Sequence, residues 1–116
     1  MCGRYELNDA PAKVGSRYRI EPGDLDFVAN ADIRPTDTNP VVVGRNGVRR
    51  LEMRRWGFVP YWAKDPKARN TPSNSVSETA PEKPFFRTAF RKRRCIVPAN
   101  AFFEWTAIPG EKKKQK

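Results

Sequence analysis

The strongest constraint on the fold is a β-hairpin that residues 40–56 specify. "PVVVG" is a short apolar run typical of a strand, and the Asn-Gly pair at 46–47 tolerates the positive φ angles that a tight hairpin turn needs. The chain then returns as a second strand, in which Leu51 and Met53 share one face while charged residues occupy the other. We therefore expect an antiparallel pair with three charged groups facing solvent or a ligand.

The segments on either side of the hairpin predict an α+β fold. "MCGRYEL" alternates enough to form a first strand, and a short helix is expected around residues 10–18. "PFFRTAFRKRR" predicts a short amphipathic basic helix, whereas "CIVPANAFFEW" predicts a strand that is covered on both faces. The expected architecture is a mixed or antiparallel β-sheet that curls toward a barrel, with short peripheral helices.

Positive charge is concentrated in the second part of the chain. The net charge is +10, and residues 1–44 hold five basic and seven acidic side chains, against 18 basic and six acidic in the remainder. This asymmetry favours a polyanionic partner, and nucleic acid rather than a membrane, because no lipidation or membrane-anchoring signal accompanies it. A soluble basic surface without such a partner is the alternative.

Two cysteines and the lack of histidine narrow the possible chemistry. Cys2 and Cys95 are too few and too far apart for a metal framework, and without histidine a Ser-His-Asp triad is excluded within this chain. We expect neither a metal nor another cofactor. Since we see no signal-peptide core and no run of membrane-spanning length, we expect a cytoplasmic protein that associates with the nucleoid when bound to DNA.

Cys2 can carry unusual chemistry if the methionine before it is removed. The residue would then hold an α-amine and a thiol, with pKa values near ~8 and ~8.5, so both would have reactive fractions at neutral pH. The amine can condense with an aldehyde to an imine, and the thiolate can close on that carbon to a five-membered thiazolidine. The alternative is a small residue tucked under the first strand.

Glu104 is a second candidate, because "AFFEW" places it between aromatic residues on a strand expected to be buried. Desolvation there would raise its pKa into the range useful for proton transfer. A structural ion pair with an arginine is the alternative. Asn74 has the properties of an ordinary loop residue when judged by spacing alone.

A nucleic-acid surface is indicated by the stretch "RRWGFVPYWAKDPK". It interleaves aromatic rings, including Trp56 and Trp62, with cations such as Lys64, and single-stranded nucleic acid is bound by such stacking and phosphate neutralisation. We expect at most two of these aromatics at a binding surface, because a small domain needs the others in its core. Arg87 and Arg91 add cations on the predicted basic helix.

Taken together, "MCGRY", "IRPTDTNPVV", "RRWGFVPYWAKDP" and "NSVSETAPEKPFFRTAFRKRRCIVPANAFFEW" resemble the SOS response-associated peptidase family, whose members process abasic sites in single-stranded DNA. The resemblance implies that Cys2, as the mature N-terminus, forms a thiazolidine with the ring-opened sugar of an abasic site. It implies that Asn74 positions the Cys2 amine and that Glu104 shuttles protons. It also implies that Arg4 and the "WGFVPYW" aromatics line the DNA groove.

The sequence departs from the family pattern in two ways. Val76 stands where the family usually has an arginine that contacts DNA, and the family domain is roughly twice as long, with a histidine in its later half. We therefore expect residues 2–116 to be the N-terminal portion of one domain, without a second domain, and to be marginally stable. The expected partners are abasic single-stranded DNA and either a C-terminal half-domain or a second copy bound through the exposed strand.

Three functions remain open at this point. The first is covalent capture of abasic sites by a DNA-damage response protein. The second is a cysteine-type peptidase that uses Cys2 and Glu104 and removes the residues before the cysteine. The third is a truncated, non-catalytic remnant that binds nucleic acid through its basic half.

Overall fold

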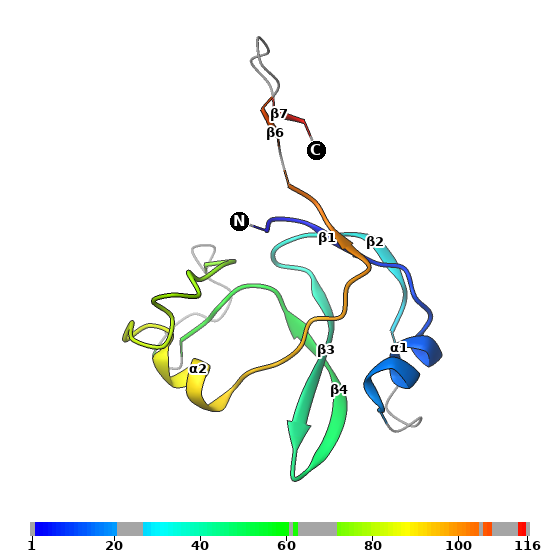
Figure 1. Cartoon of the computed structure of the whole chain (residues 1–116), viewed down its shortest axis with the longest axis horizontal. Helices are drawn as coiled ribbons and strands as arrows, with labels where there is room; N and C mark the ends of the chain where they lie inside the picture. Colours follow the sequence, from blue (N-terminus) through cyan, green and yellow to red (C-terminus); the bar gives the residue numbers. More distant parts are fainter. Residues whose placement is uncertain are drawn as a thin grey trace.

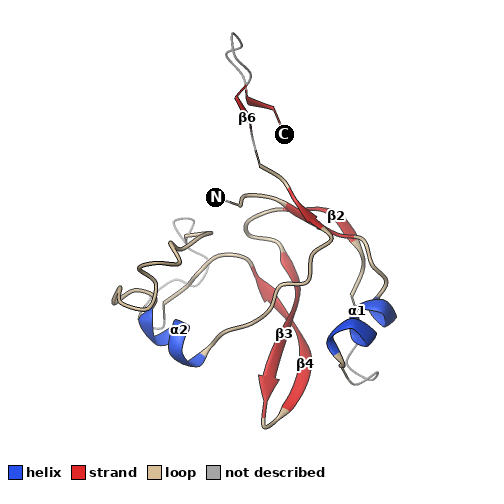
Figure 2. Ribbon diagram, in the orientation of Figure 1, coloured by secondary structure: helices blue, strands red, loops and turns tan. Residues whose placement is uncertain are grey.

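The computed structural model of this chain describes residues 2–20, 27–60, 62, 72–104, 106–107 and 114–115. Seven strands and two short helices make up the described fold, and every described strand pairing is antiparallel (Figures 1 and 2). In chain order they are β1 (Tyr5–Leu7), α1 (Pro11–Tyr18), β2 (Asn30–Ile33), β3 (Thr38–Arg45), β4 (Val48–Arg55), α2 (Arg87–Lys92), β5 (Ala101–Phe102), β6 (Thr106–Ala107) and β7 (Lys114–Gln115). The predicted α+β class is confirmed.

A three-stranded sheet with the order β2-β1-β5 carries the N-terminus. Tyr5 of β1 is opposite Ile33 of β2 on one side and opposite Phe102 of β5 on the other. Because β1 is the central strand, the residues directly before it lie between two neighbouring segments from distant parts of the sequence. This arrangement sets the surroundings of Cys2.

The predicted hairpin is present as β3 and β4, which pair from Thr38–Arg55 to Arg45–Val48. The turn residues Asn46 and Gly47 both have positive φ, 52° and 77°, as the Asn-Gly pair predicts. In Figure 1 this long hairpin runs between α1 and α2. On its charged face Glu52 is held by Arg45, whose Nη2 lies 2.9 Å from Glu52 Oε1, so this carboxylate is committed to an ion pair.

The main hydrophobic core joins α1 to the three-stranded sheet. Pro11 occupies the first turn of α1, where its missing N–H costs nothing, and the helix ends before Arg19 in the left-handed conformation. Val14 of α1 and Ile33 of β2 are each only 1% exposed. Their buried partners in the core are Tyr5, Leu7 and Phe27. The predicted helix around residues 10–18 is therefore confirmed.

The predicted strand at 95–105, covered on both faces, is wrong. Ile96 makes a single antiparallel bridge to Val42, and regular pairing resumes only in the two residues of β5. Pro98 lies between these pieces, and a proline lacks the N–H that a continuous ladder requires. Ile96 is 54% exposed and Phe102 67% exposed, because no second layer among the described residues lies over them.

One further expectation is not confirmed, and another needs correction. The described strands form separate antiparallel sheets that do not close into a barrel, so the predicted curling is not confirmed. The basic helix is shorter than predicted, since α2 begins only at Arg87, after Phe86 at its N-cap. Arg94 folds back onto the end of this helix, where its guanidinium lies 3.8 Å from the Phe90 ring centroid.

Candidate functional site

Cys2 is tied to a loop that is 72 residues away in the sequence. Asn74 Nδ2 donates a hydrogen bond to the Cys2 carbonyl oxygen at 2.8 Å, in a partly buried position. The Cys2 thiol donates weakly to the Arg4 carbonyl oxygen, with an Sγ–O distance of 3.6 Å. Two of the three predicted catalytic residues therefore touch, although the contact is with the carbonyl of Cys2.

The loop that carries Asn74 is held by the end of the hairpin. Phe58 donates its backbone N–H to the Pro72 carbonyl oxygen at 2.8 Å, and Trp56 Nε1 donates to the Ser73 carbonyl oxygen at 2.7 Å. The Trp56 ring also packs against Tyr5 of β1, with centroids 5.5 Å apart. Trp56 thus joins β1 to the Asn74 loop as a half-buried structural residue. Its predicted part in DNA binding stays a prediction.

The segment that follows β5 brings Glu104 toward the residues just before β1. The Phe103 backbone N–H donates to the Arg4 carbonyl oxygen at 2.9 Å, which continues the pairing of β5 with β1. Extending that register would set Glu104 opposite Gly3, one residue from Cys2. Glu104 is exposed, however, so its predicted burial is wrong. The reason is the open face described above, since β5 has β1 as its neighbour but no described layer over it.

A cavity of about 560 Å³ opens beside Cys2. The end of the hairpin, β1 and the segment from Cys95 to Phe102 form its walls, and most of the side chains that line it are apolar or aromatic. Cys95 lines this cavity together with Cys2. Desolvation raises the pKa of the Cys95 thiol, although part of its surface remains exposed. Sequence spacing contained no signal that the two cysteines share one cavity.

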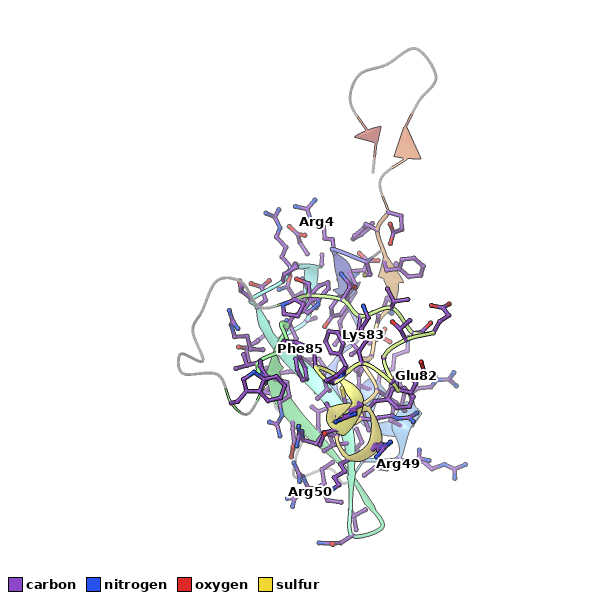
Figure 3. The ribbon with its side chains drawn as sticks, turned by 90° about the vertical axis from the view of Figure 1, so that its left-hand side faces the viewer. Arg4, Arg49, Arg50, Glu82, Lys83 and Phe85 are labelled. Atoms are coloured by element: carbon purple, nitrogen blue, oxygen red, sulfur yellow. The ribbon has the colours of Figure 1, made fainter. Side chains whose placement is uncertain are left out.

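The predicted DNA-binding cations differ in their surroundings. Arg4 Nε lies 2.8 Å from Asp32 Oδ1, and the Arg4 side chain is only 20% exposed. Arg87 and Arg91 are exposed on α2, whereas Lys64 lies outside the described residues. Figure 3 views the side that carries α2, with Arg4 toward one end, Lys83 near the middle and Arg50 on β4. Arg49 of the same strand turns to α1, where its Nη1 donates to the Tyr18 carbonyl oxygen at 3.0 Å. This face therefore combines cations from several elements.

Aromatic side chains form a half-exposed cluster on the same side of the molecule. Trp62 is 54% exposed and meets the edge of Phe85 at a centroid distance of 5.8 Å. Phe58 packs on both Phe85 and Phe86, with centroid distances of 5.1 Å in each case. Trp62 thus lies at the surface while Phe58 and Trp56 are partly buried, in line with the expectation that at most two of these rings serve a binding surface; Tyr61 lies outside the described residues. Phe85 was missed by sequence reasoning, because its contact with Trp62 depends on the fold.

In the part of the chain that the structure describes, no group of three or more Cys, Asp or Glu side chains is placed to hold a metal ion. Neither α1 nor α2, the two described helices, has the length or apolar character needed to cross a membrane.

The amino-acid sequence of this chain is similar to a protein family model and to several curated proteins. The family model described as SOS response associated peptidase (SRAP) matches residues 1–116. The chain is 31% identical over 115 residues to Abasic site processing protein YoaM of Bacillus subtilis (strain 168), covering 97% of this chain and 51% of that protein. It is 35% identical over 137 residues to Abasic site processing protein HMCES of Xenopus tropicalis, covering 97% of this chain and 41% of that protein. The chain thus spans about half the length of these curated relatives, and it belongs to the SOS response associated peptidase family.

Proposed function

We propose that this chain is a DNA-damage response protein that binds single-stranded DNA and captures abasic sites covalently through Cys2. The relatives at about 30% identity are named abasic site processing proteins, which supports a role at abasic sites. The observation that carries the covalent step is the 2.8 Å hydrogen bond from Asn74 to the Cys2 carbonyl. Chain ends are usually poorly ordered unless they are tied down, so this bond would hold in one place the terminus that removal of Met1 creates.

The chemistry requires an aldehyde and the mature terminus that follows removal of Met1. The Cys2 amine attacks the aldehyde carbon of the ring-opened abasic sugar, and loss of one water molecule leaves an imine. The Cys2 sulfur then bonds to the imine carbon while the nitrogen receives a proton, which gives a thiazolidine. No oxidant or metal enters this balance. Holding amine and thiol on one residue makes ring closure intramolecular and therefore favourable.

Glu104 would move protons during these steps. Ring opening of the sugar, formation of the imine and loss of water each need a proton to be delivered or removed. The pairing of Phe103 with Arg4 brings the following residue, Glu104, to the region just before β1. A positioned carboxyl group typically contributes about 10²–10⁴-fold to the rate of such steps.

The face with α2 and the aromatic cluster would bind the DNA strand. Exposed Trp62, supported by Phe85, offers a surface on which an unpaired base can stack, and stacking contributes about 1–3 kcal/mol per base. Arg87 and Arg91 lie close by in the sequence and would neutralise phosphates. Because stacking tolerates any base, we expect a preference for single strands without a strong preference for sequence.

The test is a denaturing gel with purified protein whose N-terminus has been verified by mass spectrometry. A single strand that carries an abasic site should give a denaturation-resistant adduct, whereas the same strand with its aldehyde reduced to an alcohol should give none. Cys2→Ala should abolish the adduct, and Cys95→Ala is the matched control that removes the other thiol. Wild-type levels of adduct from Cys2→Ala would refute the proposal.

The two alternatives predict different outcomes of the same experiment. A peptidase would cleave peptide bonds without forming the aldehyde-dependent adduct. A non-catalytic remnant would bind the strand reversibly, so its complex would dissociate in the denaturing gel.

A further inference from the structure

The cavity beside Cys2 carries two hydrogen-bond donors that lack acceptors. Asn39 is 7% exposed, and neither its Nδ2 nor Arg55 Nη1 has a hydrogen-bond partner among the described residues. Both residues line the cavity, whose volume is about 560 Å³. Buried polar groups in folded proteins are nearly always paired, and an unpaired one costs free energy. The two donors therefore indicate a ligand that supplies oxygen acceptors.

The cations that line this cavity indicate the charge of that ligand. Arg54 is one of them, and its carboxylate partner Glu52 is shared with Arg45. No ion pair among the described residues involves Arg55, so the charge of this second guanidinium is not compensated within the described part of the chain. Hydrogen bonds from a guanidinium to a phosphate or carboxylate are charge-assisted and stronger than those to a neutral acceptor. We therefore expect an oxyanion in this cavity.

The remaining walls of the cavity fit an apolar or aromatic body. Val41, Trp56 and Phe58 line it, and the Trp56 ring is held by its packing on Tyr5, with the ring centroids 5.5 Å apart. Small-molecule sites typically have volumes of about 300–1,000 Å³, apolar or aromatic walls and a few placed polar groups. The cavity meets each of these criteria. A small molecule with one anionic group on a ring or another apolar body fits it better than a bare phosphate does.

Cys2 lines the same cavity and adds a covalent step. This step rests on the aminothiol of the proposed function. We propose that the cavity selects small aldehydes that carry a phosphate or carboxylate on an aromatic or apolar body, and that Cys2 captures them as thiazolidines. The amine attacks the aldehyde carbon and one water molecule leaves. The sulfur then bonds to the imine carbon while the thiol proton passes to the nitrogen, so nothing is oxidised or reduced. These aldehydes form a substrate class separate from the abasic sugar of DNA.

Pyridoxine 5′-phosphate tests the cavity without the covalent step, because it has an aromatic ring and a phosphate but an alcohol in place of an aldehyde. Calorimetric titration of the full chain with Cys2→Ser should show saturable binding. Arg55→Gln and Asn39→Asp should each weaken it at least about tenfold, since each removes a donor to the anion. Asn39→Asp also supplies an acceptor for Arg55, which favours folding, and circular dichroism checks both variants. Arg17→Gln is the matched control, because Arg17 is exposed on α1 and does not line this cavity.

Pyridoxal 5′-phosphate tests the capture. Mass spectrometry of the chain with a verified Cys2 terminus should show the gain of one aldehyde molecule less one water. The absorbance of the conjugated aldehyde should fall, because the thiazolidine carbon is saturated. Any N-terminal cysteine reacts with aldehydes, so each rate is divided by that of a peptide with the sequence CGRY. This ratio should be at least about tenfold larger for pyridoxal 5′-phosphate than for pyridoxal, which lacks the phosphate.

The outcomes separate this inference from DNA capture. Equal ratios for the two aldehydes, without saturable binding of pyridoxine 5′-phosphate, would overturn the inference, whereas an adduct with abasic DNA would then leave the proposed function standing. Binding of pyridoxine 5′-phosphate without any adduct, from the small aldehyde or from abasic DNA, would overturn the capture step together with the Cys2 chemistry of the proposed function. Displacement of pyridoxine 5′-phosphate by an undamaged single strand would assign the cavity to a DNA phosphate, which also contradicts our choice.

Discussion

Two regions of this molecule bury their apolar side chains to very different degrees. In the core between α1 and the three-stranded sheet, Ile33 is 1% exposed, whereas Ile96 on the face beside Cys2 is 54% exposed. The side chains are chemically identical. The difference is that α1 supplies a second layer over β1 and β2, and no described element does so for the segment from Cys95 to Phe102. An apolar sequence thus indicates that burial is needed, while the surrounding elements decide whether it occurs.

The open region also holds the candidate catalytic residues. Cys2 and the Cys95–Phe102 segment line the cavity, and Glu104 follows that segment. The closed region helps to position them, because Tyr5 of the core packs on Trp56, whose Nε1 donates a hydrogen bond to Ser73, the residue before Asn74. We therefore expect substitutions in the open region to affect chemistry and those in the closed region to affect stability.

The largest effect is expected from Glu104→Gln in the open region. If Glu104 shuttles protons, adduct formation should slow by about 10²–10⁴-fold while affinity for the strand changes little. Gel kinetics and fluorescence anisotropy measure the two quantities. Glu82→Gln removes another exposed carboxylate from a turn elsewhere and should leave the rate unchanged. Parallel losses of rate and affinity in Glu104→Gln would favour a structural ion pair.

Stability should distinguish the two isoleucines. Ile33→Ala removes fully buried methyl groups and should lower the free energy of unfolding by about 2–5 kcal/mol, enough to unfold a marginal protein. Ile96→Ala is the matched change on the open face and should cost less than about 0.5 kcal/mol, because surface substitutions have small effects. Urea unfolding followed by circular dichroism measures both. Equal losses would show that the two regions are covered to the same degree in solution.

A smaller effect is expected where the two regions meet. Asn74→Ala removes the hydrogen bond to the Cys2 carbonyl, which contributes about 0.5–1.5 kcal/mol and corresponds to a rate of adduct formation several-fold slower. Asn100→Ala is the control, because the Asn100 side chain accepts a hydrogen bond from the Asn8 backbone N–H and does not bind Cys2. Adduct kinetics should separate the two variants. An unchanged rate in Asn74→Ala would mean that Cys2 is positioned by other groups.

The smallest effect concerns DNA binding at Val76, which is 50% exposed. Val76→Arg supplies the arginine that the family pattern has at this position, and it should tighten binding to a single strand. One added phosphate contact should steepen the dependence of log affinity on log salt by about 0.7. Val28→Arg adds the same charge at another exposed position and should change the slope less. Equal slopes for both variants would mean that position 76 does not face the DNA.

Features that depend on neighbours in the sequence were predictable from the sequence. The hairpin with its Asn46-Gly47 turn and the helix Pro11–Tyr18 follow from local pattern and turn chemistry, and both are present. The possibility of an aminothiol at Cys2 is likewise a property of the terminus itself. Such features need no knowledge of the rest of the fold, because the backbone conformations and reactive groups involved belong to a few adjacent residues.

Features that depend on contacts between distant segments were decided only by the tertiary structure. The Asn74–Cys2 hydrogen bond, the shared cavity of Cys2 and Cys95 and the structural role of Trp56 each join residues more than fifty positions apart or from separate elements. The exposure of Glu104 has the same origin, since an apolar neighbourhood in the sequence predicts burial only when another layer covers it. A sequence pattern indicates which faces of the strands and helices are apolar, whereas the packing of distant segments determines which of those faces are in contact.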